Sequence, residues 1–121
     1  MISFTSVFFR FMEKSIKDSL LLDNYEQLLT EKQREIMRLY VDYDVSLSEI
    51  ADQLDSTRQA VYDTVKSSLA QLETYENKLG LVEKSLILRE SIQKLENILK
   101  EDKENKELAL IKENLEKILK N

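Results

Sequence analysis

The chain has 121 residues, of which 34% are charged and 42% apolar, enough for one core with a well-solvated exterior. It contains neither cysteine nor histidine, which excludes disulfides, thiolate nucleophiles, the common zinc sites and imidazole base catalysis. Gly80 is the only glycine and there is no proline, so the chain has no glycine-rich phosphate loop and can form long helices. We therefore predict an all-α protein that is not an enzyme and that uses no metal or cofactor.

The net charge of −5 is spread evenly along the chain. Basic and acidic residues number 3 and 4 in residues 1–29, 5 and 8 in residues 30–72, and 10 and 11 in residues 73–121. No segment has the basic surplus that is typical of nucleic-acid binding. No apolar run approaches the roughly 18 residues of a membrane span, so we expect no membrane partner.

Residues 1–11 are aromatic and apolar, and the composition changes abruptly at Met12. A signal peptide would place positive charge before the apolar run and small residues after it, whereas Arg10 comes late here. We expect a non-native or disordered N-terminal extension, with Met12 as the working initiator. A genuine partner-binding extension is the alternative.

Apolar spacing predicts one helix over residues 14–29 and a second from Thr30 to about residues 42–44. The first carries one apolar face, formed by Ile16, Leu20, Tyr25 and Leu28. Thr30 and Gln33 have the spacing of a capping box, which marks the start of the second helix. The positions of the second helix that we expect to be buried are Ile36, Leu39, Tyr40 and Tyr43.

A short helix and a long helix follow. Ser46 and Glu49 repeat the capping pattern and open a helix of about eight residues. Asp55-Ser56-Thr57 favours a turn and a second cap, because these side chains compete for local backbone groups. The long helix therefore begins near Thr57, and it ends at Gly80, a suitable residue for a left-handed C-terminal cap.

Beyond Gly80, two apolar stripes alternate steps of three and four residues and are separated by the wholly polar residues 101–105. Their members are Leu88, Ile92, Leu95 and Leu99, then Leu108, Ile111, Leu115 and Ile118. The pattern predicts a helical hairpin, or one helix followed by a frayed one. A helix with an unpaired apolar stripe exposes too much apolar surface, so the stripes either fold back on the domain or pair with another chain. Of the two, we favour a homodimer through this region.

The strongest motif is a helix-turn-helix at residues 46–72. Such a unit needs a small residue where its two helices approach most closely, and Ala51 supplies it. The predicted core of the motif is Leu47, Ile50, Ala51, Leu54, Val61 and Val65. The predicted organisation is thus an extension at 1–11, a helical domain at 12–80 and a C-terminal helical extension at 81–121.

These residues carry a family resemblance. Residues 29–72 resemble region 4 of the bacterial sigma-70 family, and residues 14–99 are similar to the YlxM-type family of helix-turn-helix proteins. The matching blocks are Leu-Ser-Glu-Ile-Ala at 47–51, Arg-Gln-Ala-Val-Tyr-Asp at 58–63 and Tyr-Glu-x-Lys-Leu at 75–79. One departure is the turn, where Asp55 and Ser56 replace the usual glycine and apolar residue. Asp tolerates the left-handed backbone better than most residues, so we expect the turn to form.

The YlxM-type resemblance implies a small cytoplasmic bacterial protein that acts in, or regulates, the signal recognition particle pathway. Its expected partner is then a component of that particle, protein or RNA. The expected function is that of a non-enzymatic accessory or regulatory factor. The alternative is a dimeric helix-turn-helix regulator of transcription that binds DNA.

On a recognition helix, the outward N-terminal side chains face the bases. Here they are Arg58, Gln59, Tyr62 and Lys66, which are the candidate nucleic-acid-binding residues. Arg58 could read guanine, Gln59 adenine, and Lys66 could contact phosphate. However, residues 46–72 hold two basic and four acidic groups, and Asp63 lies on the same face. This balance favours a protein or ribonucleoprotein partner over DNA, and a plain packing role for the motif stays open.

Overall fold

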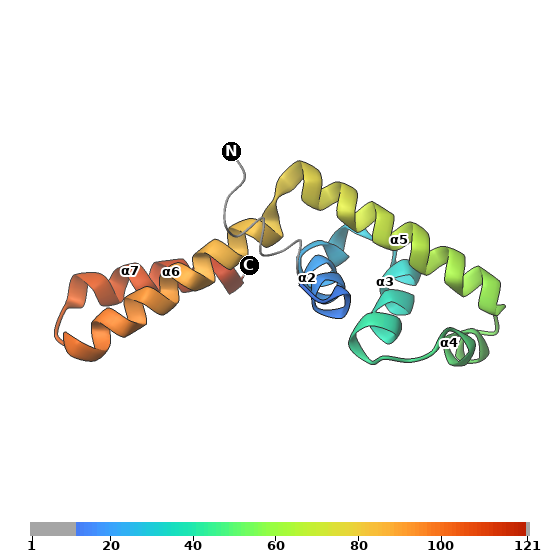
Figure 1. Ribbon diagram of the computed structural model, residues 1–121, viewed down its shortest axis with the longest axis horizontal. Coiled ribbons are helices and arrows are strands. Elements are labelled where there is room, and N and C mark those ends of the chain that lie inside the picture. Colours follow the sequence, from blue (N-terminus) through green and yellow to red (C-terminus); the bar gives the residue numbers. More distant parts are fainter. Residues whose placement is uncertain (1–11, 121) are drawn as a thin grey trace. The chain divides into compact units, whose positions relative to one another are not determined.

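A computed structural model describes residues 12–120, and the regular secondary structure in this part of the chain consists of helices, with no strand (Figure 1). The all-α prediction is therefore confirmed. The described chain forms two compact units, residues 12–82 and residues 83–120. The predicted N-terminal extension lies outside the described residues.

The first unit begins with α2 (Lys14–Tyr25), which is shorter than the helix predicted over 14–29. The chain tightens into a 3-10 turn, η1 (Glu26–Leu28), and then bends. Arg34 holds this bend, because its guanidinium donates to the backbone carbonyls of Glu26 and Leu29 at 3.2 and 3.4 Å. Leu28 lies in this turn and is half-exposed instead of buried, and so is Ile16 in the first turn of α2.

Helix α3 (Glu31–Met37) starts at the predicted capping box, which is confirmed. The Gln33 backbone N–H donates to the Thr30 hydroxyl at 3.2 Å, and the Thr30 N–H donates to the Gln33 side chain at 2.9 Å. The helix then widens into a π-helical turn, η2 (Arg38–Asp42). This widening rotates the later residues away from the core. Tyr43, which the sequence pattern placed in the core, is 72% exposed, and that expectation was wrong.

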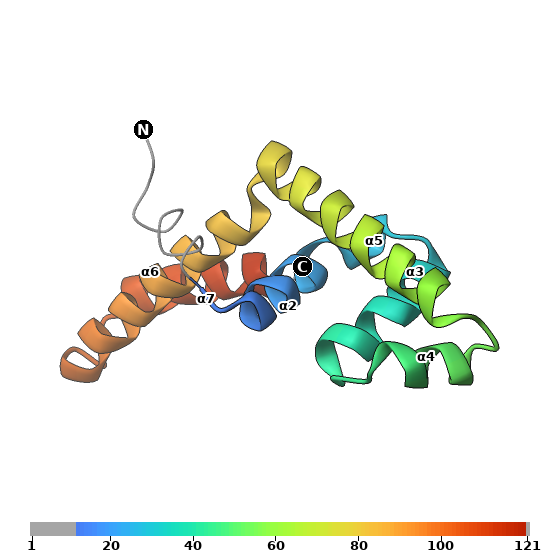
Figure 2. The ribbon, with the colours of Figure 1, turned by 45° about the vertical axis from the view of Figure 1, so that its right-hand side comes forward.

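The predicted short and long helices are α4 (Leu47–Gln53) and α5 (Arg58–Leu79). Both start at the expected caps, Ser46 and Thr57, whose hydroxyls each accept a backbone N–H three residues on. Asp55 has φ 52°, so the left-handed turn that we expected is present. Figures 1 and 2 show α2, α3 and α4 on one side of α5, which is the long spine of this unit.

The core of the first unit lies between α5 and the three shorter helices. Its fully buried side chains are Leu21, Leu22 and Tyr25 from α2, Ile36 and Met37 from α3, Ile50 from α4, and Val61 and Leu72 from α5. Burying a side chain of this size contributes roughly 1.5–3 kcal/mol. The hydroxyl of Ser68 is also buried and has no hydrogen-bond partner among the described residues.

A hydrogen-bond network fixes the point where α5 ends and α6 (Leu81–Glu101) begins. Gly80 closes α5 in the left-handed conformation, as predicted, at φ 63°. The buried hydroxyl of Tyr25 donates to Glu76 Oε1 at 2.5 Å and accepts the backbone N–H of Leu81 at 2.9 Å. The same carboxylate oxygen accepts the N–H of Val82 at 2.9 Å. Two N–H groups that the first turn of a helix leaves unpaired are thus satisfied.

Burial raises the pKa of Tyr25 to about 12, and the bond to the Glu76 carboxylate adds to this effect by favouring the neutral phenol. Because the ordinary value is 10, folding favours the protonated form. The resulting stabilisation is present below pH 10 and is lost as the pH rises toward 12.

The second unit, residues 83–120, is a helical hairpin of α6 and α7 (Lys106–Lys120), whose helices run side by side in opposite directions (Figure 2). A hairpin was the first of the two arrangements predicted, and it is the one observed. Lys112 of α7 makes a salt bridge of 3.5 Å to Glu96 of α6. The polar residues 101–105 form the bend, where Asn105 caps α7 by accepting the N–H of Leu108.

Replacing Tyr25 by Phe should lower the free energy of unfolding by about 1–3 kcal/mol, because the Glu76 carboxylate and the Leu81 N–H each lose a partner. Urea unfolding followed by circular dichroism measures this. Tyr43→Phe removes the same atom from an exposed ring and serves as the control. The wild type should also lose more stability between pH 10 and 12 than Tyr25→Phe does. Equal losses in the two substituted proteins would contradict the role of the network.

Candidate helix-turn-helix interface

The helix-turn-helix is built by local bonds that do not need a glycine. Beyond α4, the Leu54 N–H donates to the Ile50 carbonyl at 3.0 Å, and the Ser56 N–H donates to the Ala51 carbonyl at 2.8 Å. The left-handed Asp55 between them turns the chain. Thr57 then accepts the Ala60 N–H at 3.1 Å and sets the first residue of α5. These bonds determine the direction in which the next side chains leave the helix.

Four of the six residues predicted for the core of the motif are buried: Ile50, Ala51, Val61 and Val65. The other two, Leu47 and Leu54, are half-buried at the edge of α4. Ser56 stands where related turns carry an apolar residue, and it is exposed. No apolar side chain from that position therefore covers Leu54.

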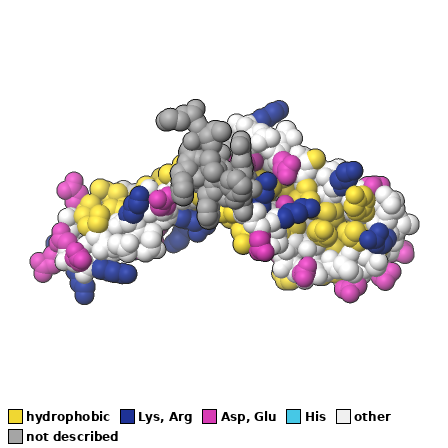
Figure 3. Space-filling model, viewed as in Figure 1, with side chains coloured by type: hydrophobic (Ala, Val, Ile, Leu, Met, Phe, Trp, Pro, Cys, Tyr) yellow, Lys and Arg dark blue, Asp and Glu magenta, His cyan; other side chains and the backbone are white. Residues whose placement is uncertain are grey.

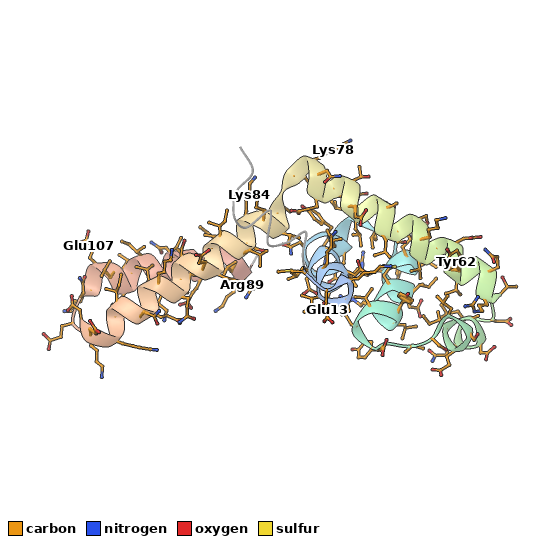
Figure 4. All side chains as sticks on the ribbon, in the orientation of Figure 1. Glu13, Tyr62, Lys78, Lys84, Arg89 and Glu107 are labelled. Atoms are coloured by element: carbon orange, nitrogen blue, oxygen red, sulfur yellow. The ribbon has the colours of Figure 1, made fainter. Side chains whose placement is uncertain are left out.

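The structure exposes all four candidate nucleic-acid-binding residues, Arg58, Gln59, Tyr62 and Lys66. At about 100° per residue, Gln59 and Lys66 lie on the side of α5 away from Val61 and Val65, and Tyr62 lies beside them. Arg58, the first residue of the helix, lies nearer the buried side. We call these four residues and Asp63 the α5 outer face. Tyr62 is 43% exposed, and Figure 4 shows it near the N-terminal end of α5.

The charges around the α5 outer face are mostly acidic. The side-chain amide of Gln59 donates to Asp63 Oδ1 at 3.0 Å, so both groups are engaged with each other along the helix. Glu49, Asp52 and Asp55 are exposed on α4 and the turn. Figure 3 shows acidic side chains gathered over α4. Any partner that approaches Arg58 and Lys66 therefore also meets carboxylates.

Within residues 12–120, no three His, Cys, Asp or Glu side chains lie close enough together to hold a metal ion. None of the helices described there is long and apolar enough to cross a bilayer. What the arrangement offers is a contact surface: two exposed cations and an exposed aromatic ring on one helix, beside several carboxylates.

Comparison with known proteins identifies the family of this chain. A family profile described as "Putative helix-turn-helix protein, YlxM / p13 like" matches residues 12–114. The chain belongs to this family. The match includes α4 and α5 and runs into α7, so it covers the first unit from residue 12 and most of the second.

Relatives in this family align over nearly their whole length. A UPF0122 protein of Bacillus mycoides (strain KBAB4) is 43% identical over 108 residues, which cover 88% of this chain and 98% of that protein. UPF0122 proteins of Bacillus thuringiensis (strain Al Hakam) and Bacillus cereus (strain 03BB102) are 42% identical over the same shares. The resemblance to YlxM-type proteins is thereby confirmed.

Replacing Thr57 by Ala should destabilise the protein by about 1 kcal/mol, because the cap of α5 is lost. Chemical denaturation measures the difference. Thr74→Ala is the matched control, since Thr74 is exposed on the same helix and only bonds back to the Ala70 carbonyl. A Thr57→Ala protein as stable as Thr74→Ala would show that the cap does not set the start of α5.

Proposed function

We propose that this protein is a non-enzymatic accessory or regulatory factor that acts by binding a protein or a ribonucleoprotein through the α5 outer face. The observation that carries this is the charge around the face: two cations stand beside Asp63 and the three carboxylates of α4 and its turn. A nucleic-acid duplex repels such a surface, because affinity for DNA comes largely from neutralising phosphates. Protein interfaces, by contrast, favour an exposed tyrosine and arginine.

The resemblance to YlxM-type proteins supports one partner in particular, a component of the bacterial signal recognition particle. The particle contains both a GTPase and an RNA, so the contact could involve either. Tyr62 and Arg58 suit a protein surface, and Lys66 suits a single phosphate. We place this activity in the cytoplasm, where the particle acts.

The alternative is a dimeric regulator of transcription. What favours it is that Arg58 and Lys66 lie on one exposed face at the start of the second helix of the motif, where recognition helices contact DNA. Two copies would double the cations on the duplex, but they would double the carboxylates as well. We therefore rank this function second.

Binding assays with purified components separate the two functions. The full-length chain is titrated against the particle GTPase, its RNA, and genomic DNA fragments at about 150 mM salt, where weak charge contacts are screened. We expect saturable binding to the GTPase or the RNA. Tyr62→Ala should weaken it by about tenfold or more, as expected for an aromatic anchor.

Lys66→Ala and Lys78→Ala form a matched pair, because both lysines are exposed on α5 but Lys78 lies near its far end (Figure 4). Only Lys66→Ala should reduce binding. Retention of DNA alone, with Arg58→Ala relaxing the base preference, would establish the regulator instead. Absence of binding to all three components would overturn both functions.

We also propose that the protein is a homodimer joined through its hairpin. Ile87 and Ile98 of α6 and Ile111 and Ile118 of α7 are each 43–57% exposed. At about 100° per residue, Ile87 and Ile98 share one face of α6, and Ile111 and Ile118 share one face of α7. Both faces lie on the same side of the hairpin, next to the residues packed between its two helices. This row, the isoleucine face, would be covered if a second hairpin packed on it in a four-helix bundle.

The double substitution Ile98→Ser with Ile118→Ser should weaken the dimer by about tenfold or more, since each buried isoleucine contributes roughly 1.5–3 kcal/mol. Light scattering over a dilution series measures the mass. Leu110→Ser is the control, because Leu110 is equally apolar and exposed but points away from α6 and from the isoleucine face. A wild-type protein that is monomeric at the highest concentration would contradict the dimer.

A further inference from the structure

A pocket of about 460 Å³ opens between α2 on one side and η2 with the residues that follow it on the other, wholly within the first unit. This volume falls within the range of small-molecule sites. Its apolar wall is formed by Tyr40, Val41 and Val45, and its charged residues are Lys14, Asp18 and Asp44. The α5 outer face contributes no residue to it, so the pocket is separate from the surface considered above.

Asp18 is the unusual member of this set. It is only 7% exposed, and no described residue makes a hydrogen bond or a salt bridge to its carboxylate. An ionised carboxylate is costly to bury without a partner. Leu21 and Leu22 follow three and four residues later on the same face of α2, and both are fully buried, which explains why Asp18 is drawn inward.

The charges that act on Asp18 come from two helices. Burial raises its pKa above the ordinary range, Glu73 of α5 adds to the increase, and Lys14 and Lys17 of α2 oppose it. A ligand cation beside the carboxylate would act in the same direction as the two lysines. The pocket as a whole holds two carboxylates and one ammonium, so its charge complements a cation.

The pocket wall is preformed by an unusual backbone. A π-helical turn such as η2 is rare and often occurs at functional sites. After it, Asp44 adopts φ 53°, and the Val45 N–H donates back to the Leu39 carbonyl at 2.9 Å. This closure holds Asp44 and Val45 at the pocket without a flexible loop.

We propose that this pocket binds an organic cation, a guanidinium or ammonium group on an apolar stem. The charged head pairs with the unpartnered Asp18, and the stem lies along Tyr40, Val41 and Val45. Such a group is found both in small free amines and in the arginine or lysine side chain of a partner protein. The chemistry is shared, and the experiment distinguishes the two sources.

The test is a nuclear magnetic resonance titration of the ¹⁵N-labelled full-length chain with butylguanidinium and, separately, with the peptide acetyl-Gly-Arg-Gly-amide. We expect saturable shifts at the backbone amides of Asp18, Val41 and Val45. Tighter binding of butylguanidinium points to a small free cation, and tighter binding of the peptide points to a side chain of a partner. Either result supports the proposal, and no saturable shift with either probe overturns it.

Variants test the role of the carboxylates. Asp18→Asn should weaken binding by about tenfold or more, because the amide keeps one acceptor oxygen but loses the negative charge that pairs with the cation. Its melting temperature should not fall, since an unpartnered buried charge is removed. Asp44→Asn is the second variant, because Asn also tolerates the left-handed backbone. It should weaken binding to a smaller degree.

Asp52→Asn removes the same charge from an exposed site on α4 and should leave binding unchanged. Binding to the wild type should strengthen as the pH rises through the pKa of Asp18, and this dependence should vanish in Asp18→Asn. Equal affinity in Asp18→Asn and the wild type would overturn the proposal, as would preferential binding of inorganic phosphate through Lys14.

Discussion

The contact on which the structure depends most is the buried hydroxyl of Tyr25. It joins α2 to the end of α5 through Glu76 and to the first backbone N–H of α6 through Leu81. One side chain thereby fixes the end of the helix that carries the candidate interface and the first residue of α6. The ring of Tyr75 packs against that of Tyr25, with the two ring centroids 5.9 Å apart, and this adds apolar contact beside the hydrogen bonds.

A second set of bonds connects the start of α3 to α5. Gln33 completes the capping box of Thr30 with its side-chain oxygen, while its amide donates to Gln71 of α5 at 3.1 Å. Gln71 in turn donates to the hydroxyl of Tyr75. The side-chain oxygen and nitrogen of both Gln33 and Gln71 thus have partners, which matters because partly buried amides are costly when unpaired. Hydrogen bonds therefore join α5 to α2 and α3 through its C-terminal half, away from the turn of the helix-turn-helix. None of these bonds involves a residue of the α5 outer face.

Much of this architecture could be predicted because its signals are local. Thr30 with Gln33, Ser46 with Glu49, and Thr57 with Ala60 act over three residues, so the starts of α3, α4 and α5 can be read from spacing alone. Gly80 and the two stripes of the tail likewise predicted the end of α5 and the hairpin. The exposure of Gln59, Tyr62 and Lys66 follows from helical periodicity once the start of α5 is known, and Arg58 is exposed at the first position of that helix.

The sequence by itself thus determined the helices, most of their caps and the helix-turn-helix, because these depend on neighbours within one turn. Tertiary structure decided the rest. Tyr25 meets Glu76 and Leu81 across 51 and 56 residues, a pairing that no local pattern encodes. The widening of α3 into η2 exposed Tyr43 against its apolar spacing. Packing on neighbouring helices buried Asp18 together with Leu21 and Leu22, although a charged side chain is ordinarily left in solvent. The residues that surround Tyr25 and Asp18 come from segments distant in the chain, which is why spacing alone does not reveal them.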